Sequence, residues 1–184
     1  MAVARARMFS LGGRRFATWN SITGCKHLCV YCWARDYAER LCLQGVGKYA
    51  RGFEPSFHPE AFKELKAKVR EARLKGGGNL FVNDMGDGFG DWVPDRWISR
   101  TLEALRRFDG EATFWFFTKN PRRYREFLPF FPRSSVLGAT IETNREYRYV
   151  YGSTHAPPRP FARARAMMNL PWPRKAVAVE PVLD

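Results

Sequence analysis

Three of the four cysteines in this chain lie within one short stretch, "TGCKHLCVYCWAR" at 23–35. Cys25, Cys29 and Cys32 have the spacing C-x3-C-x2-C, which lets three thiolates from one loop converge on a single metal centre. A structural zinc usually takes four protein ligands, often in two separated pairs, and an electron-transfer [4Fe–4S] cluster takes four cysteines. Three cysteines would leave one iron of a cluster free to bind a substrate or cofactor.

Two further residues could complete a four-ligand site. Cys42 lies ten residues beyond Cys32, along a predicted helix over 33–43. At 1.5 Å per residue this places it about 15 Å away, so we expect a small buried hydrophobic residue rather than a ligand. His27 is closer and could complete a zinc site, although its surroundings favour an exposed loop histidine. The spacing alone leaves zinc and iron–sulfur open.

The hydrophobic pattern around this loop alternates between short strands and amphipathic helices. Strands are predicted over 15–20, 79–83, 112–120, 135–144 and 175–184, and helices over 33–43, 59–76, 94–108, 121–131 and 159–170. Strands that alternate with helices form right-handed βαβ units and a parallel sheet. The chain of 184 residues is therefore expected to be a single α/β domain over 1–184, with a metal-binding loop at 23–35.

Polar side chains follow the predicted strands at the points where the strands end. They are Cys25 after the first strand, Asn83, Asp84 and Asp87 at the end of the second, Thr118 and Lys119 at the end of the third, Glu142, Thr143 and Asn144 at the end of the fourth, and Glu180 toward the end of the fifth. Ligands of parallel α/β sheets bind at the carboxyl ends of the strands. We therefore expect these side chains to gather at one edge of the sheet.

The composition narrows the function classes. A formal charge of +13 favours polyanionic partners such as nucleic acid or a nucleotide-like substrate, although an arginine-rich solvated surface would have the same composition. No run of residues is apolar and long enough to span a bilayer or to act as a signal peptide, which predicts a cytoplasmic protein. In a reducing compartment, clustered cysteines indicate metal ligands or catalytic thiols rather than disulfides.

The predicted strand over 175–184 has no helix after it to cover it. A bare apolar strand at a sheet edge is prone to association. We therefore expect an abbreviated C-terminus, a fragment, or a homo-oligomer or partner chain that covers this strand.

The cysteine loop resembles a known superfamily. "GCKHLCVYC" is similar to the radical S-adenosylmethionine (radical SAM) signature C-x3-C-x-aromatic-C, with Tyr31 as the aromatic residue. The longer stretch "TWNSITGCKHLCVYCWAR" resembles the group of spore photoproduct lyase and DNA-repair-photolyase-like proteins. In "WN..TGC", "FVND..D", the "TK" of the third strand and the "EPVLD" ending, the chain also resembles a phage-associated branch of unassigned function.

This resemblance implies a fold and an activity. The fold would be a partial (β/α) TIM-like barrel of about five βα units. Cys25, Cys29 and Cys32 would bind a [4Fe–4S] cluster whose open iron chelates S-adenosylmethionine. Reduction, by an external donor of the flavodoxin or ferredoxin type, would cleave the sulfonium to methionine and a 5′-deoxyadenosyl radical that abstracts hydrogen from the substrate.

The same resemblance implies contacts with S-adenosylmethionine. Tyr31 would pack near the adenine. Many members carry a Gly-Gly-Glu motif that binds the methionine ammonium, and this chain has "NDMGDGFGD" in its place. Asp84 or Asp87, together with Asn83, would then accept hydrogen bonds from that ammonium. The alternative is an ordinary Asp/Gly turn, and the position of the stretch after the second strand favours the binding role.

Residues after the third and fourth strands complete this expected set. Thr118 and Lys119 would face the ribose or the carboxylate of S-adenosylmethionine, and Glu142 and Asn144 would bind its ribose hydroxyls. The alternatives are a phosphate contact or a solvated lysine for Lys119 and a strand-end cap for Glu142 and Asn144.

A second function class is a non-catalytic zinc- or iron–sulfur-containing module that binds nucleic acid. Three cysteines in one loop and polar strand ends favour the enzyme. No catalytic side chain is identified, and the sequence does not choose between DNA, RNA, a nucleotide and a peptide as substrate.

Overall fold

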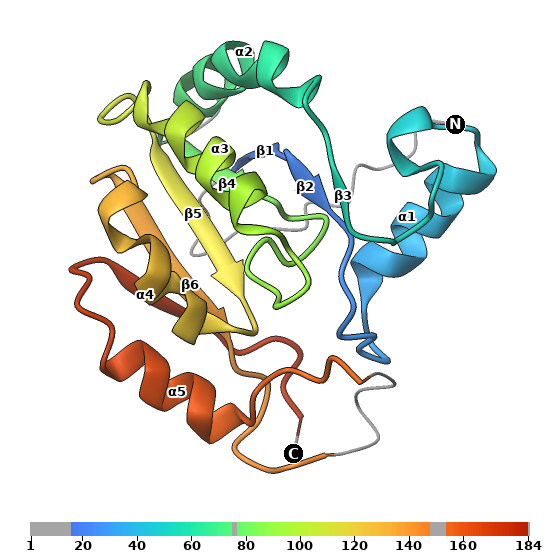
Figure 1. Ribbon diagram of the computed structural model, residues 1–184, viewed down its shortest axis with the longest axis vertical. Coiled ribbons are helices and arrows are strands. Elements are labelled where there is room, and N and C mark those ends of the chain that lie inside the picture. Colours follow the sequence, from blue (N-terminus) through green and yellow to red (C-terminus); the bar gives the residue numbers. More distant parts are fainter. Residues whose placement is uncertain (1–15, 75–76, 148–153, 184) are drawn as a thin grey trace.

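The computed structural model describes residues 16–74, 77–147 and 154–183. Its centre is a sheet in the order β1–β4–β5–β6–β7, in which every neighbouring pair is parallel. The five strands are β1 (Ala17–Trp19), β4 (Asn79–Val82), β5 (Thr113–Thr118), β6 (Ser135–Thr140) and β7 (Lys175–Ala178). The predicted parallel α/β sheet is therefore confirmed. The sheet does not close on itself, as expected for a partial TIM-like barrel (Figure 1).

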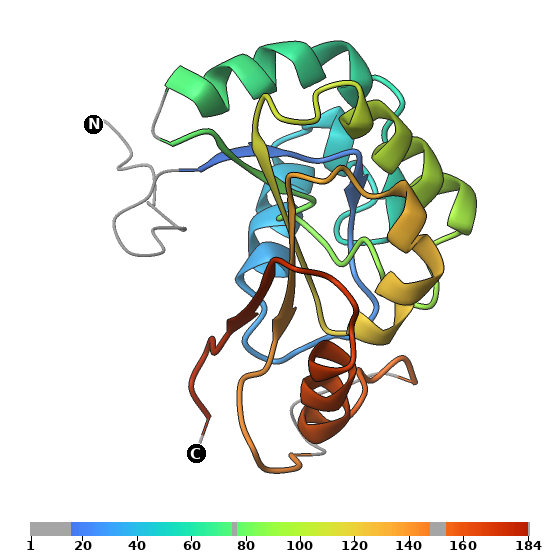
Figure 2. The same ribbon diagram turned by 90° about the vertical axis from the view of Figure 1, so that its left-hand side faces the viewer.

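Four helices follow one another around one side of this curved sheet (Figure 2). They are α2 (Ala61–Leu74), α3 (Asp95–Arg106), α4 (Tyr124–Phe127) and α5 (Pro160–Met168). Predicted as one helix, the segment 121–131 is instead α4 flanked by two 3₁₀ turns, Pro121–Arg123 and Leu128–Phe130. Pro129 lacks a backbone N–H and so ends the α-helix early.

The core lies between the sheet and these helices. In β5, buried residues alternate with half-buried ones, so Phe114 and Phe116 point into the core while Trp115 lies on the other face. Helix α3 meets them with Ile98 and Leu102, which lie four residues apart and therefore on one helical face. The two-residue alternation of the strand and the four-residue spacing of the helix thus place apolar side chains on both sides of one interface.

Helix α1 (Trp33–Leu43) lies apart from the other four helices, beside a small antiparallel pair of strands (Figure 1). Its predicted bounds are confirmed, and it ends before Gly45, whose φ of 72° is the left-handed conformation common after helix ends. A separate small cluster of buried residues packs beneath it, with Ala34, Ala38, Tyr49 and Met85 at its centre.

Strands β2 (Ile22–Thr23) and β3 (Ser56–Phe57) form that antiparallel pair, which the sequence analysis does not predict. A 3₁₀ turn, Gly47–Tyr49, lies in the connection between α1 and β3. This antiparallel pair places the start of the cysteine loop next to the segment that leads into α2.

Two glycines allow three backbone segments to meet at the start of the cysteine loop. Gly24 and Gly86 form an isolated parallel bridge, and Gly24 has a φ of 84°. A Cβ atom on Gly86 would lie 2.5 Å from the Gly24 carbonyl oxygen, and one on Gly24 would lie 2.5 Å from the Glu54 backbone. A side chain at either position would therefore push these backbones apart.

Strand β7 is an edge strand that pairs with β6 alone among the described residues. Val177 in β7 and Val179 just beyond it are exposed. The partner or second copy predicted to cover this strand stays a prediction. Across the described ranges, none of the helices is both long and apolar enough to traverse a bilayer.

Candidate metal and cofactor site

The cysteine loop lies at the carboxyl edge of the parallel sheet. It is fixed there by backbone hydrogen bonds from Gly24 N to Met85 O (2.9 Å) and from Asp87 N to Gly24 O (3.3 Å). Cys29 is buried, Cys25 and Cys32 are half-buried, and all three are free thiols. Cys32 is also the residue that precedes the first turn of α1.

Burial raises the pKa of all three thiols, that of Cys29 to about 11. The carboxylate of Asp87 raises the pKa of Cys25 further. The ammonium of Lys119 acts to lower the pKa of Cys29, but burial outweighs it. Hydrogen bonds from backbone N–H groups at the start of α1 act to lower the pKa of Cys32, again less strongly than burial raises it. The thiols are protonated in the metal-free protein, so a metal that binds them must displace protons.

His27 is buried, with 3% of its surface exposed, so the prediction of an exposed loop histidine was wrong. Its Nδ1 donates a hydrogen bond to the carbonyl oxygen of His155 (2.6 Å), and its Nε2 lies 3.3 Å from Asp87 Oδ2. The ring of Trp92 packs against it edge-on at 4.7 Å. Both ring nitrogens face protein oxygens, which leaves no nitrogen directed at the cysteines as a fourth ligand.

Asp87 is the buried carboxylate that joins the cysteine loop to the end of β5. Its oxygens accept hydrogen bonds from Thr118 Oγ1 (2.7 Å), Lys119 N (2.9 Å) and Phe89 N (3.0 Å). Burial by itself raises the pKa of Asp87, but the contact with His27 and the hydrogen bonds outweigh it, so the pKa lies below its usual value. This carboxylate is charged and already surrounded by protein donors.

Lys119 joins the cysteine loop to the end of β6. Its Nζ donates to Tyr31 OH (3.0 Å) and to Glu142 Oε2 (2.8 Å), and it lies 5.3 Å from the centre of the Tyr31 ring. Glu142 also accepts two hydrogen bonds from the guanidinium of Arg163 on α5. The buried carboxylate thus has two cationic partners and holds the lysine ammonium toward the loop.

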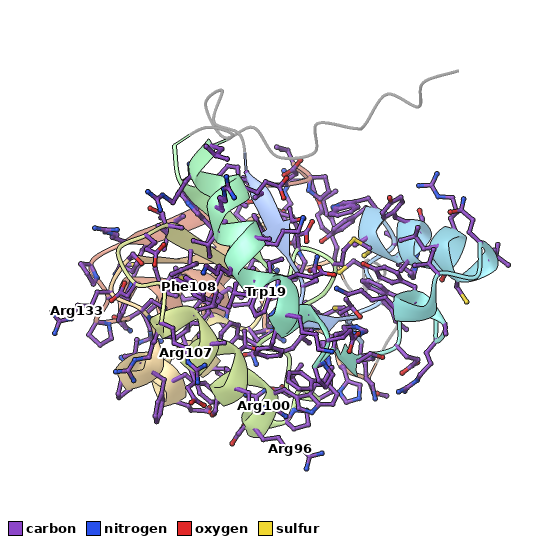
Figure 3. The ribbon with its side chains drawn as sticks, turned by 90° about the horizontal axis from the view of Figure 1, so that it is seen from above. Trp19, Arg96, Arg100, Arg107, Phe108 and Arg133 are labelled. Carbon is purple, nitrogen blue, oxygen red and sulfur yellow. The ribbon has the colours of Figure 1, made fainter. Side chains whose placement is uncertain are left out.

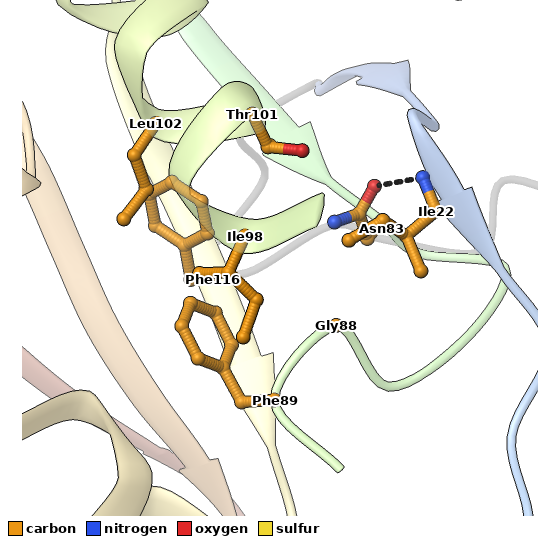
Figure 4. Close-up of a pocket in the computed structure, with 8 residues that line it drawn as sticks. All are labelled: Ile22, Asn83, Gly88, Phe89, Ile98, Thr101, Leu102 and Phe116. Atoms are coloured by element: carbon orange, nitrogen blue, oxygen red, sulfur yellow. Dashed lines mark hydrogen bonds between the residues drawn. The ribbon is translucent and has the colours of Figure 1, made fainter. Parts of the chain in front are cut away.

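Asn83 connects the end of β4 to the segment between β1 and β2. It has a φ of 61°, and its Oδ1 accepts hydrogen bonds from the backbone N–H groups of Ser21 (3.1 Å) and Ile22 (3.0 Å) (Figure 4). Asn83 also lines a pocket between α3 and β5, which has no room for a water molecule. This pocket is a packing defect of the core and is separate from the cysteine loop.

Asp84, Asn144 and Glu180 have fewer protein partners. Asp84 is half-buried and accepts a hydrogen bond from Asn20 Nδ2 (2.6 Å) through Oδ1. Burial raises the pKa of Asp84, and the Asn20 contact and the Lys48 ammonium act against that shift. Asn144 and Glu180 are exposed beyond the ends of β6 and β7.

Two features of the site are missing from the sequence analysis or differ from it. Arg163 was not expected in the site. It lies between Pro160 and Met167 on the buried side of α5. A charged residue at such a position signals a buried acidic partner. Cys42, predicted to be buried, is half-buried and lies 3.6 Å from the Ala50 carbonyl oxygen.

The cysteine loop offers three thiols as possible donors to a metal group. Among the residues that the structure describes, no three His, Cys, Asp or Glu side chains come close enough together to hold one metal ion. Three thiols on one loop, with basic Lys119 beside Cys29, are suited to an anionic iron–sulfur cluster.

Solved structures of spore photoproduct lyase, a radical SAM enzyme, share this fold. A complex with dinucleoside spore photoproduct has a TM-score of 0.54 at 16% identity, over 88% of this chain and 44% of that one. A variant with bound AdoMet and the same ligand has a TM-score of 0.57 at 16% identity, over 89% and 45%. Another variant reaches 0.58 at 16% identity, over 97% and 49%. The chain therefore spans about half the length of these enzymes, and the shared fold confirms its resemblance to spore photoproduct lyase.

No curated protein sequence matches the chain. The likeness to the phage-associated branch stays a prediction. Residues 15–159 match one protein family, DUF5131, which is described as a protein of unknown function. Since this match covers most of the chain, the protein belongs to the DUF5131 family.

Proposed function

We propose that this protein is a radical SAM enzyme in which Cys25, Cys29 and Cys32 bind a [4Fe–4S] cluster and leave one iron for S-adenosylmethionine. The observation that carries the proposal is the position of the three-cysteine loop at the carboxyl edge of an open parallel sheet. Spore photoproduct lyase, whose fold this chain shares, is a radical SAM enzyme. When bound, the cluster would supply the electron that breaks the sulfonium bond to C5′ and so yields methionine and the hydrogen-abstracting 5′-deoxyadenosyl radical.

Four of the predicted cofactor-binding residues are proposed to contact S-adenosylmethionine. Tyr31 would pack on the adenine, and Lys119, held toward the loop by Glu142, would bind the carboxylate or ribose. Asp84 would accept a hydrogen bond from the ammonium of S-adenosylmethionine through Oδ2, the carboxylate oxygen that does not bind Asn20. Asn144, exposed at the end of β6, would bind a ribose hydroxyl.

The other four are proposed to position the site. Asn83, Asp87, Thr118 and Glu142 are buried, and protein groups already occupy their side chains. Asp87 with Thr118 would hold the cysteine loop against β5, and Glu142 would orient Lys119. If these four side chains bound the cofactor directly, as the sequence predicts, their present hydrogen bonds would have to exchange when the cofactor binds.

The substrate is proposed to be a nucleic acid or nucleotide. The formal charge of +13 supports a polyanion, and spore photoproduct lyase was solved with a dinucleoside lesion. An external one-electron donor of the flavodoxin or ferredoxin type would reduce the cluster.

Anaerobic reconstitution with iron and sulfide tests the proposal. The protein should turn brown, bind about four irons per chain as a [4Fe–4S] cluster requires, and release 5′-deoxyadenosine when S-adenosylmethionine and dithionite are added. A colourless protein with one tightly bound zinc and no 5′-deoxyadenosine would favour the non-catalytic module and overturn the proposal.

A further inference from the structure

Three arginines form a row along the exposed face of α3. Arg96, Arg100 and Arg107, the last just past the helix end, are spaced so that they lie on one side of the helix (Figure 3). All three are exposed. Glu103 lies on the same face, 3.5 Å from a guanidinium nitrogen of Arg107. We call Arg96, Arg100 and Arg107 the α3 arginine row.

Arg100 is held in place by aromatic rings. Its guanidinium carbon lies 5.4 Å from the centre of the Phe57 ring and 5.8 Å from that of Phe62. Phe57 is itself stacked on Trp97, with ring centres 5.5 Å apart and planes 18° apart.

This stacking prepares Arg100 for an anionic partner. A guanidinium that stacks through its face keeps its N–H donors in the plane of the group, where they bind phosphate in a bidentate manner. Within the described part of the chain, neither Arg96 nor Arg100 has a side-chain hydrogen bond or an ion pair. Less side-chain entropy is then lost when Arg100 binds a phosphate.

The α3 arginine row begins at the carboxyl edge of the sheet, because α3 follows β4 in the chain. Helix α3 follows the loop 83–94, which carries the site carboxylates. Arg123 fixes the helix start to this loop, because its guanidinium binds the carbonyl oxygens of Gly90 and Val93 and pairs with Asp95 at 2.5 Å. A ligand that lies along α3 is therefore led toward the loop and the carboxyl edge of the sheet.

We propose that the α3 arginine row binds the phosphate backbone of a nucleic acid strand and leads that strand to the candidate site. From Arg96 to Arg107 the helix rises about 16 Å, at 1.5 Å per residue, which is enough for contacts with several consecutive phosphates. That the bound strand is also the substrate rests on the proposed function. The binding itself does not.

Fluorescence anisotropy with labelled oligonucleotides tests this binding surface. Single-stranded DNA, duplex DNA and single-stranded RNA of equal length are titrated with the protein over a series of salt concentrations. For the strand type that binds, Arg100→Gln should weaken binding about ten-fold at low salt and reduce the slope of log K against log salt by about one. The triple change Arg96→Gln, Arg100→Gln and Arg107→Gln should reduce that slope by about two to three.

Arg40→Gln is the matched control. Arg40 is an exposed arginine on α1 whose guanidinium carbon lies 5.5 Å from the Tyr37 ring centre, so it has the same stacking chemistry at a remote place. This variant should keep the wild-type slope. Arg100→Lys, which retains charge but not the planar stack, should keep the slope and weaken binding a few-fold.

The proposal is overturned if Arg40→Gln lowers the slope as much as Arg100→Gln, or if the triple variant binds every strand type as the wild type does. Cleavage of S-adenosylmethionine without substrate is measured in parallel. If that cleavage is absent while binding depends on the α3 arginine row, the proposed function fails and the binding surface stands.

Discussion

Arg163 on α5 and Glu142 at the end of β6 form a bidentate ion pair inside the protein. The two guanidinium nitrogens lie 2.7 and 2.9 Å from the two carboxylate oxygens, and the side chains are 0% and 1% exposed. Lys119 binds the same carboxylate through its Nζ, which also donates a hydrogen bond to Tyr31 OH in the cysteine loop.

The ion pair predicts a large loss of stability on mutation. Arg163→Met removes the bidentate partner of the buried Glu142 carboxylate, and breaking a buried pair from one side costs about 3–5 kcal/mol. Denaturant unfolding measures this free energy. Arg165→Met, at an exposed position of the same helix, should change it by less than about 0.5 kcal/mol. Equal effects of the two changes would mean that the buried pair contributes little.

The cysteine loop predicts a split among the four cysteines. Single Ala substitutions at Cys25, Cys29 or Cys32 should abolish the brown colour and most of the bound iron, because each would remove one of three ligands. Cys42→Ala should keep both, since Cys42 lies at the far end of α1. Iron and sulfide are measured after anaerobic reconstitution, and circular dichroism checks that each variant is folded. Iron loss in the Cys42 variant would contradict the ligand assignment.

Lys119 is predicted to act on S-adenosylmethionine rather than on folding. Lys119→Met should reduce 5′-deoxyadenosine formation about ten-fold or more, chiefly by weakening cofactor binding, while cluster content is retained. Glu142 keeps Arg163 as a partner in this variant, which protects the fold. Lys66→Met, on the exposed face of α2, is the control and should behave as wild type. Wild-type turnover in the Lys119 variant would remove this lysine from the site.

Gly86 is predicted to be essential for the position of the cysteine loop. In Gly86→Ala the new Cβ would meet the Gly24 backbone at 2.5 Å, so the loop must shift. We expect a destabilisation of about 2 kcal/mol or more, together with a lower cluster content. Gly47→Ala has open space around its Cβ and should be neutral or slightly stabilising. A neutral Gly86 variant would contradict the close contact.

Asp109 predicts a pH-dependent contribution to stability. Its carboxylate accepts hydrogen bonds from the N–H groups of Arg133 and Ser134 and from the Ser134 hydroxyl. Slight burial tends to raise the pKa of Asp109, but these donors outweigh it, so the pKa lies below its usual value. The contribution is therefore present above the unfolded-state pKa of about 3.9 and lost as the pH falls through the folded-state value.

Asp109→Asn should consequently be less stable than wild type near neutral pH by about 0.5 kcal/mol, because hydrogen bonds to a charged acceptor are stronger than those to a neutral one and solvent screens part of the difference at this exposed site. The two unfolding free energies, measured with urea over a pH series, should converge toward pH 3. A difference that stays constant over the series would show that charge at this position is irrelevant.

The elements with strong local patterns were predictable. The bounds of α1 and the presence and order of the five parallel strands follow from the local residue pattern. The ends of β6 and β7 do not, because these strands stop at Thr140 and Ala178, short of the predicted ends at 144 and 184. Strands β2 and β3 were not predictable, because two residues each are too few to make a pattern. Their pairing depends on how the chain folds around them.

The candidate site was predictable in its residue types and less so in its contacts. The polar strand ends were identified from the sequence, and Asp87, Lys119 and Glu142 do make contacts that join neighbouring elements. The burial of His27 depends on His155, which is 128 residues away, and no local signal reports it. The partner of Glu142 is one of many arginines, and only the packing of α5 selects Arg163.

The order in which the loop and its supports occur in the chain has a consequence for biosynthesis. The contacts described above fix the cysteine loop through Met85, Asp87, Lys119 and His155, all synthesised after it. As the chain leaves the ribosome, the three thiols emerge well before the groups that bury them. During translation they are therefore open to oxidants and to stray metal ions, and the proposed cluster would be loaded most safely after the strands β4 to β6 have emerged and docked.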